Sequence, residues 1–285
     1  MDGAGHHLSP SEPLRGTCPL CATAGGVAEL AWRDYHLLRC AGCGLVYADR
    51  REVPPALYDQ AYEDLAFYQE YFAQARQSPG RRHIAWAWRH FFRMVPGHGR
   101  ILDIGCATGT FMSAARERGW EPAGVDVSPA ATRVAAELTG GEVHVGTVEA
   151  CRFADGTFDA VTAWEVLEHV PDPLGFVSEI CRILKPGGSF ALSTPNWRSP
   201  WERATTDVNR RPPFHLTYWS PEPLVRLLTQ RGFEQVITRE KPVAWAEEVG
   251  RLKWIYLPVA IVRSVVFDQK GNRLFALARK PLSPS

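Results

Sequence analysis

From residue 100 onward, short apolar stretches alternate with longer ones in which apolar residues recur every three or four positions. The short stretches are typical of buried strands, and the longer ones of helices with one apolar face. The predicted strands cover 100–105, 121–128, 142–148, 158–167 and 189–196. The predicted helices cover 108–119, 129–140 and 173–188. Alternation of this kind predicts an α/β fold, in which helices cover both faces of a largely parallel sheet.

The pattern continues less regularly toward the C-terminus. Strands near 234–240 and 273–279 are expected to close the sheet, with an inserted helical segment near 243–267 between them. The apolar run at 254–267 is interrupted by Arg263 and is shorter than the ~20 residues that span a bilayer. We expect a helix packed on the domain or on a second subunit, which leaves a homodimer open. Contact with a membrane surface is the less favoured alternative.

The overall charge narrows the choice of partner. Lys and Arg total 32 and Asp and Glu total 31, so the formal net charge of the 285 residues is +1. This balance counts against a nucleic-acid partner, because phosphate binding requires a dense basic surface. Residues 1–16 show no export or organelle signal, so the expected location is the cytoplasm.

Four of the seven cysteines form two C-x-x-C pairs, Cys18 with Cys21 and Cys40 with Cys43. Two such pairs separated by eighteen residues are typical of a zinc ribbon, in which a hairpin connects two tight turns. Four thiolates complete a tetrahedral zinc site and leave no position for substrate, so the expected zinc is structural. Reduced thiols without metal are the alternative.

A run of small residues, Asp103-Ile-Gly105-Cys-Ala107-Thr-Gly109, follows the first predicted strand and opens the first predicted helix. Such a turn lets the backbone approach a ligand, and Asp126 after the next strand is placed to bind ribose hydroxyls. These features indicate a nucleotide-like ligand. The glycine spacing differs from the G-x-G-x-x-G of dinucleotide-binding proteins.

Three segments together resemble the class I S-adenosylmethionine-dependent methyltransferases: "ILDIGCATGTFMSAARERGWEPAGVDVS", "GTFDAVTAWEVLEHVPDP" and "ILKPGGSFALSTPN". The resemblance implies a Rossmann-like sheet and S-adenosylmethionine as cofactor. It implies that Gly105, Ala107 and Gly109 surround the methionine end, that Asp103 helps to bind the amino group, and that Asp126 accepts from the ribose. The other cofactor-binding residues implied are Val127, Thr147, Val148, Glu149 and Trp164.

Two positions depart from the family pattern. Ala107 stands where the family usually has glycine, which the backbone tolerates if its φ is negative. Thr147 replaces a frequent aspartate at the adenine-binding stretch, so Glu149 or backbone amides are expected to bind the adenine. A Rossmann-like domain for another nucleotide and a non-catalytic scaffold remain as alternatives.

The whole chain resembles a narrower group, the zinc-ribbon methyltransferases associated with sugars, cell-surface glycans and natural products. The segments concerned are "CPLC", "RCAGCGLVYADR" and "FHLTYWSPEPLVRLLTQRGF". The expected domains are a flexible N-terminus (1–15), a zinc ribbon (16–50), a connector with cofactor-covering helices (51–98) and the methyltransferase domain (99–285). Some rRNA methyltransferases also carry such a ribbon, so RNA is a competing acceptor.

The segment "WEVLEHVPDP" also resembles ubiquinone-biosynthesis O-methyltransferases and brings Glu165, Glu168 and His169 within five positions. Residues at i, i+3 and i+4 share one face of a helical turn. The cluster also resembles that of metal-dependent RNA 2′-O-methyltransferases, which a later histidine completes. This resemblance implies that Glu165, Glu168 and His169, with His215 from a later loop, bind a divalent cation (Mn²⁺, Fe²⁺, Co²⁺ or Zn²⁺ rather than Mg²⁺), which would lower the pKa of an acceptor hydroxyl.

Two other interpretations of this cluster stay open. His169 could act as a general base oriented by one of the glutamates. Alternatively, Glu168 could cap the helix that starts near Asp172, with His169 packed in a turn. Arg210 and Arg211 are predicted either to pair with an anionic group on a small-molecule acceptor or to form a solvated surface. Carbon and nitrogen acceptors also remain open.

Overall fold

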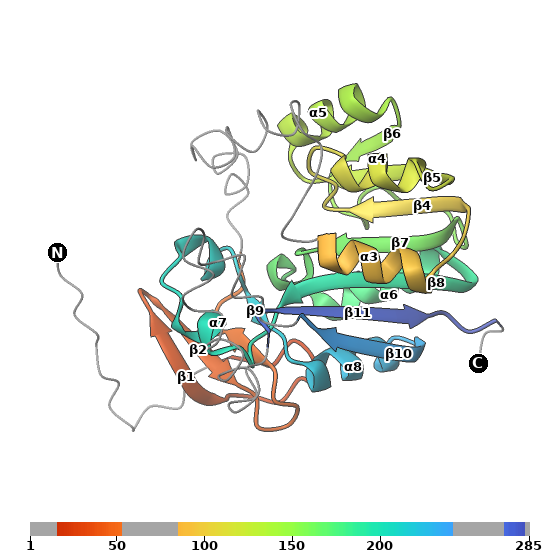
Figure 1. The fold of residues 1–285 in the computed structure, drawn as a ribbon. Coiled ribbons are helices and arrows are strands. Elements are labelled where there is room, and N and C mark those ends of the chain that lie inside the picture. The colour runs from red at the N-terminus through yellow and green to blue at the C-terminus, as the bar shows by residue number, and fades with distance from the viewer. Residues whose placement is uncertain (1–15, 53–84, 242–270, 283–285) are drawn as a thin grey trace, which may run out of the picture.

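Two sheets organise the chain in the computed structural model, which describes residues 16–52, 85–241 and 271–282 (Figure 1). The larger sheet has seven strands in the order β10-β11-β8-β7-β4-β5-β6, and the smaller has four in the order β1-β2-β3-β9. The predicted insertion at 243–267 and most of the predicted connector lie outside the described residues.

The large sheet is mixed. Strands β4 (Gly99–Ile104), β5 (Trp120–Asp126), β6 (Glu142–Val145), β7 (Phe158–Trp164) and β8 (Leu184–Pro195) are parallel. Strand β11 (Arg273–Arg279) runs antiparallel between β8 and β10 (Glu234–Glu240). The bounds of these last two strands are those predicted from the sequence. The order of the parallel strands reverses between β4 and β7, and ligands bind at the carboxyl ends of strands near such a reversal.

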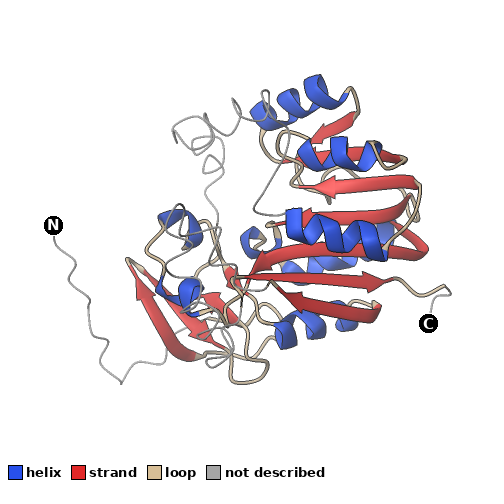
Figure 2. Cartoon of the chain, in the orientation of Figure 1, coloured by secondary structure: helices blue, strands red, loops and turns tan. Residues whose placement is uncertain are grey.

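Helices cover both faces, as predicted (Figure 2). On one face lie α3 (Ala85–Met94), α4 (Thr110–Arg116) and α5 (Pro129–Thr139), and on the other α6 (Pro173–Ile183) and α8 (Pro221–Gln230). Helix α5 begins after Ser128 and α6 after Asp172, whose side chains accept from backbone N–H groups of the first turn. Because Asp172 provides the cap of α6, the capping role considered for Glu168 is wrong.

The small sheet begins in residues 16–52, which we call the N-terminal unit. Strands β1 (Val27–Trp32) and β2 (Tyr35–Arg39) form the predicted hairpin between the two cysteine pairs, and β3 (Val46–Ala48) pairs antiparallel with β2. The fourth strand, β9 (Thr217–Tyr218), comes from the loop that follows β8. The N-terminal unit therefore shares its sheet with a segment of the main domain.

The remaining elements are short and lie near the carboxyl ends of the parallel strands. Helix α7 (Pro200–Ala204) and the 3₁₀ turns η1 (Leu167–His169) and η2 (Val208–Arg210) follow β8 or β7. In Figure 1, β9 lies between the N-terminal unit and the large sheet. Among the described residues, no helix has the length and apolar character needed to cross a bilayer.

Candidate active site

The turn between β4 and α4 has a left-handed backbone at three positions, Gly105 (φ 69°), Ala107 (φ 47°) and Gly109 (φ 75°). The condition under which alanine would be tolerated at this position, a negative φ, is therefore not met at Ala107. Its N–H group donates to Asp126 Oδ2 at 2.9 Å, and this bond helps to hold the unfavourable conformation. A Cβ on Gly105 would lie 2.5 Å from Val166 Cγ2, so this turn is packed directly against the residue that follows Glu165.

Two buried carboxyl groups lie beside this turn. Asp103 accepts from Thr162 Oγ1 at 2.8 Å, and Asp126 accepts from the N–H groups of Ser128 and Ala107, each at 2.9 Å. Burial raises the pKa of Asp103 to about 8, and it also raises the pKa of Asp126. A carboxyl group in this state gains stability as an anion when a cationic group binds next to it.

The other predicted cofactor residues lie at the ends of β5, β6 and β7. Val127 is 42% exposed directly after β5, and Val148 is buried after β6. Thr147 and Glu149 on either side of it are exposed, and Thr147 Oγ1 accepts from the N–H of Ala150. The Trp164 ring lies in the apolar layer under α3 and α4, 5.2 Å from the ring of Phe111. Their roles toward the cofactor stay predictions.

Glu165 begins the turn after β7 with a left-handed backbone, φ 57°. Its carboxylate accepts from Ser193 Oγ at 2.8 Å and pairs with Arg273 Nε at 2.7 Å. Neither partner was singled out in the sequence, because a serine in a strand and an arginine at a strand end carry no pattern of their own. These two bonds place both carboxylate oxygens of Glu165 toward β8 and β11.

Glu168, His169 and His215 lie together, with one potential ligand atom from each within 4.8 Å of the others. Of the predicted cation ligands, Glu165 is the one outside this group. Glu168 is 1% exposed and accepts from Thr194 Oγ1 at 2.9 Å. The Nδ1–H of His169 donates to the carbonyl oxygen of Phe214 at 2.9 Å, which in the neutral ring leaves the lone pair on Nε2.

The two imidazoles of this trio have the charge state of cation ligands, whereas Glu168 has to lose its proton to bind a cation. Burial raises the pKa of Glu168, with a further increase from Glu165. Burial lowers the pKa values of His169 and His215, and His169 lowers that of His215 further. Both imidazoles are therefore neutral near pH 7. The Nδ1 atom of His215 is buried without a hydrogen-bond partner, an unfavourable state that a ligand would relieve.

The arginines of the loop after β8 bind protein groups. Arg211 is fully buried and donates to the carbonyl oxygens of Glu202, Arg203 and Thr205 at the end of α7. Both interpretations made for it from the sequence, binding of an acceptor anion and a solvated surface, are therefore wrong. Arg210 pairs with the buried Glu202 at 2.7 Å.

The four predicted zinc ligands also lie together. Cys18 Sγ is 3.5 Å from Cys43 Sγ, Cys21 Sγ is 3.4 Å from Cys40 Sγ, and all four sulfurs lie within 4.8 Å of one another. A tetrahedral site with Zn–S bonds of about 2.3 Å requires sulfurs about 3.8 Å apart. The two C-x-x-C turns have the same hydrogen bond. The N–H of Ala22 donates to the carbonyl of Cys18 and the N–H of Gly44 to the carbonyl of Cys40, each from a residue with a left-handed backbone. The geometry fits zinc.

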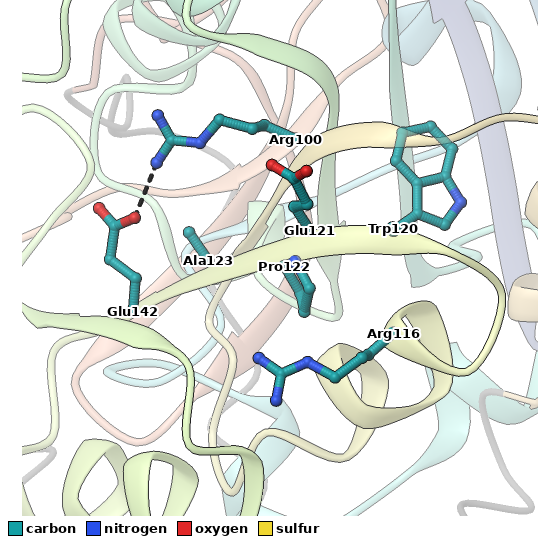
Figure 3. Close-up of a pocket in the computed structure, with 7 residues that line it drawn as sticks. All are labelled: Arg100, Arg116, Trp120, Glu121, Pro122, Ala123 and Glu142. Atoms are coloured by element: carbon teal, nitrogen blue, oxygen red, sulfur yellow. Dashed lines mark hydrogen bonds and ion pairs between the residues drawn. The ribbon is translucent and has the colours of Figure 1, made fainter.

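An open hollow of about 260 Å³ lies at the other edge of the large sheet (Figure 3). Its walls come from the first residues of β4, β5 and β6 and from the end of α4, and Arg100 pairs with Glu142 across it at 2.7 Å. Parallel sheets bind their ligands at the carboxyl ends of strands, so this hollow at the amino ends is separate from the candidate site.

Comparison with known proteins agrees with this arrangement. The model of a methyltransferase domain family matches residues 65–238. A ubiquinone biosynthesis O-methyltransferase of Xanthomonas axonopodis pv. citri (strain 306) is 32% identical over 190 residues, which are 64% of this chain and 72% of that protein. Another of that name, from Alkalilimnicola ehrlichii, is 37% identical over 158 residues, 52% of this chain and 59% of that protein.

Among solved structures, phosphoethanolamine N-methyltransferase 2 of Haemonchus contortus in complex with S-adenosyl-L-methionine has a TM-score of 0.58. It is 20% identical, and the match covers 81% of this chain and 60% of that one. At this identity the likeness shows the fold alone, so the acceptor has to be argued from the site itself.

Proposed function

This chain belongs to the class I S-adenosylmethionine-dependent methyltransferases, and we propose that it methylates a hydroxyl oxygen of a small-molecule acceptor with the help of a divalent cation. The acceptor would be a sugar, a glycan or a phenolic or other natural-product metabolite. The observation that carries the proposal is the meeting of Glu168, His169 and His215 at the carboxyl edge of the sheet.

The turn after β4 fits the cofactor. Gly105 and Gly109 give the turn its left-handed backbone directly before α4, and Asp126 lies at the end of the neighbouring strand, where it would accept from ribose hydroxyls. Asp103 would become ionised beside the cationic amino group of the cofactor. The sulfonium supplies an activated methyl group, so the chain's own residues have to orient and activate the acceptor oxygen.

The trio supports a hydroxyl acceptor because a hydroxyl is a poor nucleophile near pH 7. A cation held by Glu168, His169 and His215 would lower the pKa of a hydroxyl bound to it and would orient that oxygen. One carboxylate and two imidazoles suit Mn²⁺, Fe²⁺, Co²⁺ or Zn²⁺ better than Mg²⁺. Gly105 packs against Val166, two residues before Glu168, so the cofactor turn lies next to this trio.

Glu165 would act by positioning. It would anchor the start of the turn that carries Glu168 and His169 through its bonds to Ser193 and Arg273. The same site also supports an alternative mechanism without a metal. His169, oriented by the carbonyl of Phe214 and neutral near pH 7, would act as a general base and remove the proton of the acceptor.

The four cysteines would bind a structural zinc. Their near-tetrahedral spacing and the matching turns of the two pairs support this assignment. Several buried apolar side chains of the N-terminal unit, among them Leu38, Leu45 and Tyr47, belong to the same core as the main domain, so a metal would supply much of the unit's own folding free energy.

A manganese titration followed by electron paramagnetic resonance tests the cation site. The wild type should bind Mn²⁺ saturably, Glu168→Ala and His215→Ala should lose this binding, and Glu117→Ala, which alters an exposed carboxylate at the end of α4, should retain it. S-adenosylmethionine and a panel of phenols, sugars, amines and thiols would then identify the acceptor by mass spectrometry of the products.

Two results would change the assignment. Absence of Mn²⁺ binding, together with loss of turnover in His169→Ala, would replace the cation by the general base. Methylation of amines or carbon atoms alone would contradict a hydroxyl acceptor.

A further inference from the structure

The second cysteine pair is continuous with strand β3. The N–H of Cys40 donates to the carbonyl of Leu45 at 2.9 Å, and β3 starts at the next residue, Val46. Tyr47 in the middle of β3 is fully buried, and its hydroxyl lies 3.0 Å from the carbonyl oxygen of Gly25. The position of β3 therefore depends on the fold of the unit that contains the four cysteines.

Strand β3 also holds the segment that carries His215. Val46 pairs with Tyr218 and Tyr47 with Thr217, and the N–H of Ala48 donates to the carbonyl of Leu216 at 2.9 Å. A strand of two residues such as β9 has little stability of its own, so its place depends on its partners, and β3 is one of them.

On its other side the same segment is bonded to the turn that carries Glu168. The N–H of Leu216 donates to the carbonyl of Glu168 at 2.8 Å, and Thr217 Oγ1 donates to the carbonyl of Leu167 at 3.3 Å. Leu216 thus bridges the two parts, since its carbonyl accepts from the N-terminal unit and its N–H donates to the trio's turn.

The His215 side chain gains little from its own surroundings. Its ring is buried and Nδ1 lacks a hydrogen-bond partner, which disfavours this placement. The Tyr218 hydroxyl donates to the carbonyl of His215 at 3.2 Å, so β9 supports the backbone at that residue. The β3–β9 pairing therefore contributes to keeping His215 opposite His169, together with the bonds of Leu216 and Thr217 to the turn that carries Glu168.

We propose that the N-terminal unit positions His215, so that zinc at the four cysteines and a divalent cation at Glu168, His169 and His215 bind cooperatively. The cooperativity rests on the proposed function, whereas the positioning of residues 213–220 can be measured without the second cation. Coupling between two binding sites is reciprocal, so loss of zinc should weaken the second site about 5- to 150-fold.

Hydrogen exchange tests the positioning on the full-length chain. The Cys43→Ser variant should lose zinc, and its peptides covering residues 166–170 and 213–220 should exchange faster. Peptides covering 101–105 and 120–126, in β4 and β5, should stay protected, and S-adenosylmethionine should still bind. Cys151→Ser, which alters a cysteine outside the group of four, should behave as the wild type.

A second pair of variants tests the hydrogen bond from Ala48 in β3 to Leu216 and leaves all four cysteines in place. Ala48→Pro removes the N–H that donates to Leu216, and Ala48→Gly keeps it. The proline variant should retain zinc, bind Mn²⁺ more weakly and exchange faster at 213–220. The glycine variant should resemble the wild type in all three measurements.

Unchanged exchange at 213–220 in both Cys43→Ser and Ala48→Pro would overturn the inference. Absence of Mn²⁺ binding in the zinc-loaded wild type would instead count against the proposed function. The exchange result would still decide whether the N-terminal unit positions His215.

Discussion

His169 and His215 meet edge to face, with ring centroids 4.7 Å apart and ring planes at 88°. They lie far apart in the sequence, one in the turn after β7 and the other in the loop after β8. Two neutral imidazoles in contact, His215 buried and His169 half-buried, form a poor packing unit, because their polar ring nitrogens need hydrogen-bond partners. Such an arrangement is typical of a site whose residues serve binding rather than stability.

His215→Leu should separate the contribution of His215 to cation binding from its effect on stability. Leucine fills a similar volume and removes the unpartnered Nδ1, so we expect the free energy of unfolding in denaturant to rise by about 1 kcal/mol. The same change should abolish Mn²⁺ binding and turnover. Loss of stability together with retained Mn²⁺ binding would contradict both parts.

Asp103 should make cofactor binding dependent on pH. Its pKa is about 8 in the folded protein without cofactor, so binding of a cationic amino group beside it should release a proton. Affinity for S-adenosylmethionine should therefore rise between pH 6 and 8, by up to about tenfold per pH unit, and level off above 8. Calorimetry in two buffers of different ionisation enthalpy measures the released proton, and Asp103→Asn should release none.

The same carboxyl group should affect the stability of the cofactor-free protein. The group ionises near pH 4 when the chain is unfolded and near pH 8 when it is folded, so between these values the native state binds more protons. Its contribution to stability is therefore lost as pH rises through this range. Asp103→Asn should show a weaker decline of the unfolding free energy between pH 5 and 8.

Glu165 and Arg273 should behave as a coupled pair. Both side chains are largely buried, and removal of either should lower the free energy of unfolding by about 1–3 kcal/mol, because the other is left unpaired. A double-mutant cycle with Glu165→Gln and Arg273→Met should give a clear interaction energy. Additive effects would indicate that the pair contributes nothing to holding the turn. If it does hold the turn, each variant should also weaken Mn²⁺ binding.

Ala107 offers a test of the turn that faces the cofactor. Ala107→Gly relieves the strain of the left-handed backbone but raises the conformational entropy of the unfolded chain. The net gain in stability should therefore be at most about 1 kcal/mol, with cofactor affinity retained. Ala107→Val places a β-branched residue at a positive φ. It should lower stability by about 1–3 kcal/mol and weaken cofactor binding, as thermal shift with added S-adenosylmethionine would show.

The alternation of strands and helices predicted the parallel strands of the large sheet, although β8 starts at Leu184, inside the predicted helix 173–188. The bounds expected for β10 and β11 were also correct. The sequence pattern did not predict β9, because two residues are too few to show an alternation. It also misplaced Arg211, since a fully buried arginine bonded to carbonyl groups at a helix end runs against the usual exposure of that residue.

Within the candidate site, the spacing of Glu168 and His169 predicted that they would lie together. Their loop and the loop of His215 both follow parallel strands at the carboxyl edge of the sheet, which predicted that His215 would lie beside them. The spacing could not separate Glu165 from this group. Its carboxylate is directed by Ser193 and Arg273, and those contacts depend on the pairing of β8 with β11. Partners brought by tertiary structure leave no periodic signal in the sequence.

The pairing of Tyr47 with Thr217 joins residues 170 positions apart. At about 5–20 residues per second, a ribosome needs roughly 10–30 s to synthesise the chain between them. During that time β3 is an unpaired strand edge, which can associate with other chains. Early zinc binding would fold the N-terminal unit but leave that edge open, so completion of the small sheet is a late event in the folding of the nascent chain.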